Sequence, residues 1–273
     1  LTDAQLGALT GAQVGALTDA QVAALSPAQV ASLSDAQVAG FTASNADALT
    51  AAQLNAMATA GHIDGLTDAA VAAIPAATVG AVAPATVAAL TDAQLGALTG
   101  AQVGALTAAQ IDALTPAQIA ALGTDIGSLS NAALASLDAA QIGALTDAQV
   151  AALTPAQVAS LTDAQVAGFT ASNADALTAA QLNAMATAGH IDGLTDAAVA
   201  AIPAATVGAV APATVAALTD AQLGALTGAQ VGALTDAQVA ALSPAQVASL
   251  SDAQVAGFTA SNADALTAAQ LNA

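Results

Sequence analysis

The side chains that could carry chemistry in this 273-residue chain are 19 aspartates and two histidines, and there is no Lys, Arg or Cys. Carboxylate oxygens are the ligands that Ca²⁺ prefers, and the aspartates recur along the whole chain. No D-x-D-x-D-G loop and no glycine-rich calcium nonapeptide accompanies them. We therefore expect no cofactor, with Ca²⁺ as the alternative, and we expect most aspartates to be solvated.

The two histidines occupy one position in duplicated sequence. His62 and His190 both stand in Ala-Gly-His-Ile-Asp-Gly, within a nine-residue unit, and Asp64 follows His62 closely. No second nearby His and no Cys completes a metal site, and no G-x-S-x-G motif supports a Ser-His-Asp triad. The pattern predicts a structural corner at each histidine, and the chain is predicted not to be an enzyme.

The charge distribution argues against two classes of partner. With a formal charge of −19 and no cationic side chain, the chain has nothing that could neutralise phosphates, so we expect no nucleic-acid binding. Residues 69–90 carry no charge and are long enough to span a bilayer. However, they contain Pro75 and Pro84 and lack flanking Lys or Arg, so we expect no membrane insertion.

An eight-residue repeat must position all of these side chains. The unit reads T-[DGPA]-A-Q-[VLI]-[AG]-[AGS]-L, and about 34 units fill the chain without a linker. Residues 1–56 recur identically as 218–273, and residues 17–106 recur as 145–234 with two differences. We therefore expect residues 1–273 to form a single continuous array, and we interpret it as a window of a longer protein.

Each octad carries the signals of a helix start. Thr18 is a preferred N-cap, and Gln21 lies three residues later, where its side chain can bond the N–H of the cap. Leu17 and Val22 have the spacing of a hydrophobic staple, and Asp19 occupies the first helical position, where the helix dipole favours an anion.

Proline supports the same phase, because it is tolerated at the first helical position and costs about 3 kcal/mol inside a helix. The residue before proline is pushed out of the α region, as an N-cap requires. Each octad is therefore predicted to form a helix of about two turns. The capping residues around three of the prolines are Ser26, Pro27, Gln29, Thr115, Pro116, Gln118, Thr154, Pro155 and Gln157.

A single octad cannot be stable alone, because ordering eight residues costs on the order of 12 kcal/mol while its Leu and Val contribute roughly 1.5–3 kcal/mol each. Stability must come from stacking, so we predict an all-α solenoid or superhelical rod with one short helix per octad. A β-solenoid is the alternative. We expect Gln, Thr and Asp at the rims and a core that includes Leu17, Val22, Leu25, Val30, Leu33 and Phe41.

Over nearly its whole length the chain resembles the L-T-x-A-Q-V-x-A-L octads of very large bacterial surface and adhesin-like proteins. Leu153-Thr154-Pro155-Ala156-Gln157-Val158 is one example. This resemblance implies an extracellular or cell-surface location. We expect a structural protein, the repetitive shaft of a bacterial extracellular filament, sheath or adhesin stalk, with further copies of its own repeats as partner. A Ca²⁺-dependent or ice-binding repeat module is the alternative.

Overall fold

The computed structural model describes residues 2–272, and the chain groups into two compact units, Leu1–Ser136 and Leu137–Ala273. Within the described residues it forms 29 α-helices, five 3₁₀ helices and no strand. The predicted all-α fold is therefore confirmed, and the β-solenoid alternative has no support. In the sequence, the octads run across the boundary between Ser136 and Leu137 without an inserted residue. That residues 1–273 form a single continuous array stays a prediction.

Unit 1 contains fourteen α-helices and three 3₁₀ helices. They are α1 (Asp3–Gly7), α2 (Gly11–Gly15), α3 (Asp19–Ala23), α4 (Pro27–Ala31), α5 (Asp35–Val38), η1 (Ala46–Ala48), α6 (Ala51–Ala60), η2 (Ile63–Gly65), α7 (Asp68–Ala73), α8 (Ala76–Ala81), α9 (Pro84–Ala88), α10 (Asp92–Gly96), α11 (Gly100–Ala105), α12 (Ala108–Asp112), α13 (Pro116–Ala121), η3 (Gly123–Ser128) and α14 (Asn131–Leu134).

Unit 2 contains fifteen α-helices and two 3₁₀ helices. They are α15 (Ala139–Gly143), α16 (Asp147–Ala152), α17 (Pro155–Ala159), α18 (Asp163–Val166), η4 (Ala174–Ala176), α19 (Ala179–Ala188), η5 (Ile191–Gly193), α20 (Asp196–Ala201), α21 (Ala204–Ala209), α22 (Pro212–Ala216), α23 (Asp220–Ala225), α24 (Gly228–Gly232), α25 (Asp236–Ala241), α26 (Pro244–Ala248), α27 (Asp252–Val255), α28 (Ala260–Ala263) and α29 (Ala268–Leu271).

Most helices are four to six residues long, which is shorter than the predicted two turns. The reason is that two residues of an octad are extended. At the end of α16, Leu153 has φ −66° and ψ 134°, and the next residue, Thr154, has φ −72° and ψ 154°. Only five or six residues of an octad are therefore left for the helix.

The longest helices, α6 and α19, have ten residues each and end at a glycine in the left-handed region. Gly61 has φ 83° and Gly189 has φ 85°, a conformation that residues with a Cβ rarely adopt. The histidine follows directly in both copies. The predicted corner is thus a left-handed helix end followed by a 3₁₀ turn, η2 or η5.

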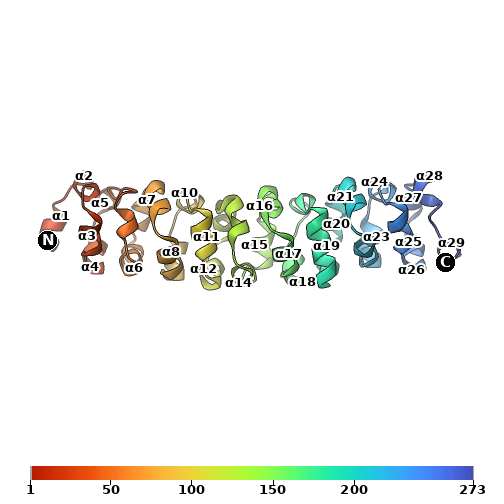
Figure 1. Cartoon of the computed structure of the whole chain (residues 1–273), viewed down its shortest axis with the longest axis horizontal. Helices are drawn as coiled ribbons and strands as arrows, with labels where there is room; N and C mark the ends of the chain where they lie inside the picture. Colours follow the sequence, from red (N-terminus) through yellow and green to blue (C-terminus); the bar gives the residue numbers. More distant parts are fainter. Residues whose placement is uncertain (1, 273) are drawn as a thin grey trace. The chain divides into compact units, whose positions relative to one another are not determined.

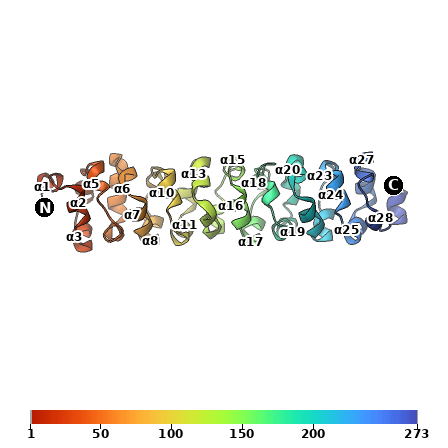
Figure 2. The ribbon, with the colours of Figure 1, turned by 90° about the horizontal axis from the view of Figure 1, so that it is seen from above.

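Within each unit the short helices wind into a coil in which each turn packs on the turn before it. In unit 1, α2 packs against α5 and α8 packs against α11; in unit 2, α20 packs against α23 and α21 packs against α24. In Figure 1, α7 and α10 lie toward one edge of unit 1 and α8 and α12 toward the other. Figure 2 shows α20 and α19 on opposite sides of unit 2.

Neighbouring turns approach closely enough to need glycine at some contacts. A Cβ placed on Gly168 would lie 2.6 Å from the carbonyl oxygen of Ala139, and a Cβ on Gly40 would overlap the backbone of Gly11. By contrast, a Cβ on Gly224 would meet nothing within 4 Å. Glycine at positions 40 and 168 therefore permits the close packing of one turn on the next.

Candidate functional site

The recurrent polar arrangement of this protein is the start of each helix. At α3, the backbone N–H of Thr18 donates to Oε1 of Gln21 at 2.9 Å, and the N–H of Gln21 lies 3.4 Å from Oγ1 of Thr18. The hydroxyl of Thr18 also donates to Oε1 of Gln21 at 3.1 Å. The hydroxyl is thus used as both acceptor and donor within its own helix start.

The helix starts that contain proline have the same geometry. In α4, α13 and α17 the proline is the first helical residue, and the Ser or Thr before it is the N-cap with an extended backbone. Each cap and its Gln form the reciprocal pair: Ser26 with Gln29, Thr115 with Gln118, and Thr154 with Gln157. The missing N–H of proline leaves no bond unmade here, because the first N–H of a helix has no intrahelical acceptor.

The glutamine side chain has a second role at its other end. Nε2 of Gln53 donates to the carbonyls of Val22 and Leu25 at 2.8 and 2.9 Å. These carbonyls belong to the end of α3, 31 and 28 residues earlier. One Gln therefore satisfies a backbone group at the start of its own helix and two backbone groups at the end of a helix in the preceding turn.

This contact recurs along both units and sets the length of a turn. Gln102, Gln110, Gln230, Gln238 and Gln270 each donate to two carbonyls that lie 31 and 28 residues before them. One turn of the coil therefore takes 28 to 31 residues, just under four octads. We call this set of contacts the glutamine ladder.

The ladder corrects the expected position of glutamine. Gln was predicted at the rim together with Thr and Asp, but Gln149 and Gln238 are 0% exposed, while Thr18 and Asp19 are exposed as expected. Burial is tolerated because the whole amide is hydrogen-bonded. The described residues contain no buried side-chain N or O atom without a hydrogen-bond partner.

The predicted core residues differ in exposure along the chain. Val22, Val30, Leu33 and Phe41 are at most 1% exposed. Leu17 and Leu25 are only partly buried. Both lie in the first turn of unit 1. Leu234 and Leu242, which occupy the same places in the identical copy of the sequence, are 4% exposed, so the difference arises from the packing of the turns and not from the local sequence.

Asparagine replaces glutamine in one type of octad. Oδ1 of Asn45 accepts the N–H of Thr42, and Nδ2 donates to the carbonyls of Val14 and Leu17 at 3.0 and 3.1 Å. Asn173 makes the corresponding bonds in unit 2, to Ile142 and Leu145. The shorter amide therefore makes the same contacts across turns.

Three consecutive octads, residues 66–89, have no Gln, and one of them uses an amide from the preceding turn. Oδ1 of Asn55 in α6 accepts the N–H of Ala83 at 2.8 Å and the hydroxyl of Thr86 at 2.7 Å. Thr86 is 4% exposed, so this bond satisfies a buried hydroxyl at the start of α9. Asn183 makes the same two bonds to Ala211 and Thr214.

These octads also line a small apolar pocket in each unit. Each is about 20 Å³ and is lined almost wholly by apolar side chains, between residues 54 and 98 in unit 1 and between residues 182 and 226 in unit 2. Val82 and Val210, which line these pockets, stand where most octads have Leu. Neither cavity can hold a substrate-sized molecule.

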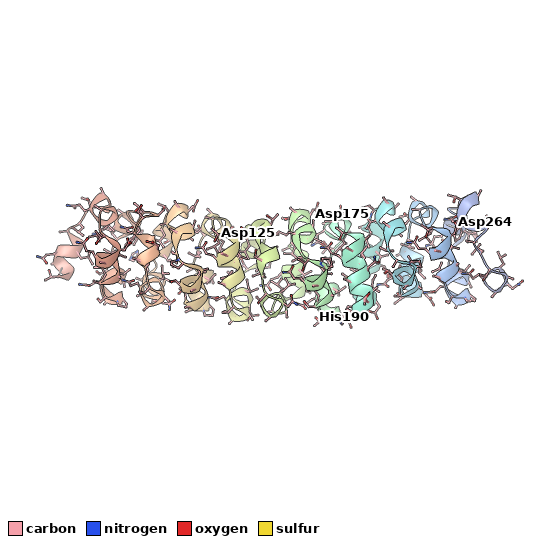
Figure 3. The ribbon with its side chains drawn as sticks, viewed as in Figure 1. Asp125, Asp175, His190 and Asp264 are labelled. Carbon is pink, nitrogen blue, oxygen red and sulfur yellow. The ribbon has the colours of Figure 1, made fainter. Side chains whose placement is uncertain are left out.

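The histidines pair with aspartates of the preceding turn. Nδ1 of His62 lies 2.5 Å from Oδ1 of Asp35, and Nδ1 of His190 lies 2.6 Å from Oδ1 of Asp163. The partner is therefore not the nearby Asp64 but a residue 27 positions earlier. Figure 3 shows His190 at the edge of unit 2 opposite to Asp175. Both pairs are partly solvated, which limits their contribution to about 0–1 kcal/mol.

Two further features bear on the sequence predictions. Residues 2–272 contain no group of three or more His, Cys, Asp or Glu side chains arranged to hold a metal ion. Within the same residues, no helix has the length and apolar character needed to cross a membrane. The uncharged segment 69–90 is divided among α7, α8 and α9.

The glutamine ladder was missed at the sequence level, although the sequence holds a signal for it. A capping box accepts Glu as readily as Gln, yet every acidic residue here is Asp and no Glu occurs. A position that must accept at one oxygen and also donate from the same side chain can use Gln but not an ionised Glu. The exclusion of Glu therefore indicated a second, donating contact.

Comparisons with known proteins identify one similarity. A family model described as the ALTTAQ repeat matches residues 1–35, 87–124, 124–155 and 215–252, which together make up just over half of the chain. No curated protein matches the chain. The matched stretches consist mainly of octads with a complete Thr–Gln capping box.

Proposed function

Because the chain belongs to the ALTTAQ repeat family, and is thus a repeat protein, we propose that it is the repetitive shaft of a bacterial extracellular filament, sheath or adhesin stalk. The observation that carries this proposal is the glutamine ladder. It makes the contact between turns nearly the same at the octads that carry Gln or Asn, so the coil can be lengthened by adding turns. Gln102 and Gln230 illustrate this, with the same two bonds in different units.

The proposed role is mechanical, and the chain itself catalyses no reaction and needs no cofactor. Each ladder contact joins residues 28 to 31 positions apart, so pulling on the chain must break buried hydrogen bonds before a turn can open. The absence of Lys and Arg removes every site that trypsin cleaves, which suits a protein outside the cell. Its partners are further copies of its own repeats, and neither nucleic acid nor membrane insertion is part of the role.

Electron cryo-microscopy of extracellular material from cells that make this protein tests the proposal. We expect continuous filaments or stalks in which a turn of 28 to 31 residues recurs along the axis. Labelling with an antibody against the repeat must decorate the shaft along its length. An intracellular location of the label, or material without any such repeat, would contradict the proposal.

The acidic charge gives a second test of the same role. With a formal charge of −19 and no cation, neighbouring shafts repel each other at neutral pH and low salt. We expect lateral bundling, measured by turbidity or sedimentation, to increase when millimolar Ca²⁺ is added or when the pH is lowered to about 4. Unchanged turbidity under both conditions would argue against bundling shafts.

A further inference from the structure

The glutamine ladder is interrupted at one place inside each unit. Residues 186–218 form four consecutive repeat units without a Gln, and residues 58–90 form the corresponding run in unit 1. In unit 2 the place of the ladder glutamine is taken by His190, Ala198, Thr206 and Thr214. Elsewhere in the chain at most two consecutive units lack Gln. We call the contact of residues 186–218 with the turn before them, and its copy at residues 58–90, the ladder-free boundary.

Backbone carbonyls that face this boundary have lost their donors. Leu145 and Leu153 close their octads and accept hydrogen bonds from Asn173 and Gln181 of the next turn. The next three octads close at Leu161, Phe169 and Leu177, and no described group donates to the carbonyl oxygens of these residues. All three residues are at most 1% exposed. Buried carbonyls without a partner make the closed boundary less favourable.

The polar contacts that remain across the boundary are few. In unit 2 the His190–Asp163 pair crosses it, and Asn183 accepts from the N–H of Ala211 and the hydroxyl of Thr214. The His–Asp pair is partly solvated, so it adds little to the stability of the closed boundary.

The next boundary along the same unit has a complete ladder. Gln222, Gln230, Gln238 and Gln246 each donate to two carbonyls of residues 186–218. One turn of the coil is therefore held by a complete ladder on one side and mainly by apolar packing on the other. The same turn also lines the small apolar pocket of unit 2.

From these observations we propose that the coil yields at the ladder-free boundary, where residues 186–218 part from the turn before them while the adjacent ladder contacts stay closed. Local opening occurs where the fewest interactions must break, and this boundary lacks the buried amide bonds of its neighbours. The copy at residues 58–90 gives each unit one such boundary. The inference concerns the fold and goes beyond the proposed function; in a shaft, these boundaries supply elements that extend under load and close again.

A buried thiol on each kind of boundary tests the proposal, because the chain has no Cys of its own. Val166 lies on the ladder-free boundary, where a Cβ on Gly193 would lie 3.3 Å from the Cβ of Val166. Val150 is the matched control, because its helix α16 packs against η4 across a boundary that Gln181 bridges. Both valines are 0% exposed, and both follow the sequence Asp-Ala-Gln.

The measurement is the rate at which the folded variants Val166→Cys and Val150→Cys react with a disulfide reagent, each divided by the rate of its urea-unfolded form. We expect Val166→Cys to react at least about tenfold faster, because one lost buried hydrogen bond changes the opening equilibrium by up to about tenfold. The difference must persist well below the urea midpoint, where unfolding of the whole chain contributes little. Equal rates, or a difference confined to the unfolding transition, would overturn the inference.

Removal of a ladder glutamine tests the cause. Nε2 of Gln181 donates to the carbonyls of Val150 and Leu153 at 2.7 and 2.8 Å. In the Val150→Cys background, Gln181→Ala is expected to raise the reaction rate about tenfold. Gln222→Ala, which removes a ladder glutamine from a different boundary, is the control and is expected to leave the rate unchanged. An unchanged rate with Gln181→Ala, or an equal rise with Gln222→Ala, would contradict the proposal.

Failure of this inference and failure of the proposed function give different results. Equal thiol reactivity of Val166→Cys and Val150→Cys overturns the yielding boundary, and extracellular stalks in microscopy would then still support the structural role. Faster reaction of Val166→Cys in a protein that is found inside the cell would overturn the extracellular role and leave the boundary supported.

Discussion

Gln53 is hydrogen-bonded to Leu25, with 2.9 Å between Nε2 of the glutamine and the carbonyl oxygen of a residue 28 positions earlier. The same side chain accepts the N–H of Thr50 through Oε1 at 2.7 Å. A short helix leaves a large share of its backbone groups without intrahelical partners, and here one amide satisfies both ends. This relationship explains how a helix of five residues such as α3 can have the carbonyls at its end hydrogen-bonded by a side chain of the next turn.

The identical sequences make a controlled test of the ladder. Gln238→Glu is expected to destabilise unit 2 by about 1–3 kcal/mol, because it leaves the carbonyls of Val207 and Val210 facing a buried carboxyl group. The loss is expected to grow above about pH 4.3, the usual pKa of glutamate, since the protonated acid can still donate one bond. Urea unfolding at several pH values, monitored by circular dichroism, measures the free energy of unfolding of the variant and of the wild type.

Gln21→Glu is the matched control for that substitution. It has the same neighbours in sequence, but its side chain is exposed and its Nε2 has no acceptor among residues 2–272. We expect a change within about 0.5 kcal/mol. Equal destabilisation by the two substitutions would show that the capping box alone, and not the contact between turns, explains the recurrence of Gln in the octads.

Close backbone contact predicts opposite effects for two glycine substitutions in unit 2. Gly168→Ala places a methyl group 2.6 Å from the carbonyl oxygen of Ala139 and is expected to cost about 1–3 kcal/mol. Gly224→Ala, in helix α23, meets nothing within 4 Å and is expected to be neutral or to stabilise by about 0.5–1 kcal/mol. The melting temperatures of the two variants, compared with that of the wild type, test both expectations. A lower melting temperature for Gly224→Ala would contradict the packing described.

The bond between Asn183 and Thr214 can be measured with a double-mutant cycle. Asn183→Ala removes the acceptor of a buried hydroxyl and is expected to cost about 1–3 kcal/mol. Thr214→Val removes the hydroxyl itself, so in its presence Asn183→Ala is expected to cost about 1 kcal/mol less. Additive losses in urea unfolding would mean that the two side chains do not interact.

Leucines in identical local sequence are expected to differ in their contribution to stability. Leu234→Ala removes a side chain that is 4% exposed and is expected to cost about 2–5 kcal/mol. Leu17→Ala lies in the same octad sequence but in the partly exposed first turn, so we expect less than half of that loss. Thermal unfolding of the two variants gives the comparison, and equal losses would contradict the role of the covering turn.

The sequence alone determined the local structure, because each helix start is decided within one octad. Thr18, Asp19 and Gln21 specify a cap, a first helical residue and a reciprocal bond at fixed spacing, and proline excludes any other phase. The all-α class, the position of capping pairs such as Thr18–Gln21 and the burial of Val22 and Phe41 could be predicted for this reason.

Only the tertiary structure decided how many octads make a turn and which of two identical copies of a side chain is buried. Residues 1–56 and 218–273 are identical, yet Gln21 is exposed whereas Gln238 is 0% exposed. Likewise, Val38 is 0% exposed and its copy Val255 is 51% exposed. Burial here depends on a turn 28 to 31 residues away, and the octad repeats too often for local sequence to specify which distant octad becomes the neighbour. In the folded chain the amide of Gln53 and the carbonyls of Val22 and Leu25 join two such neighbouring turns.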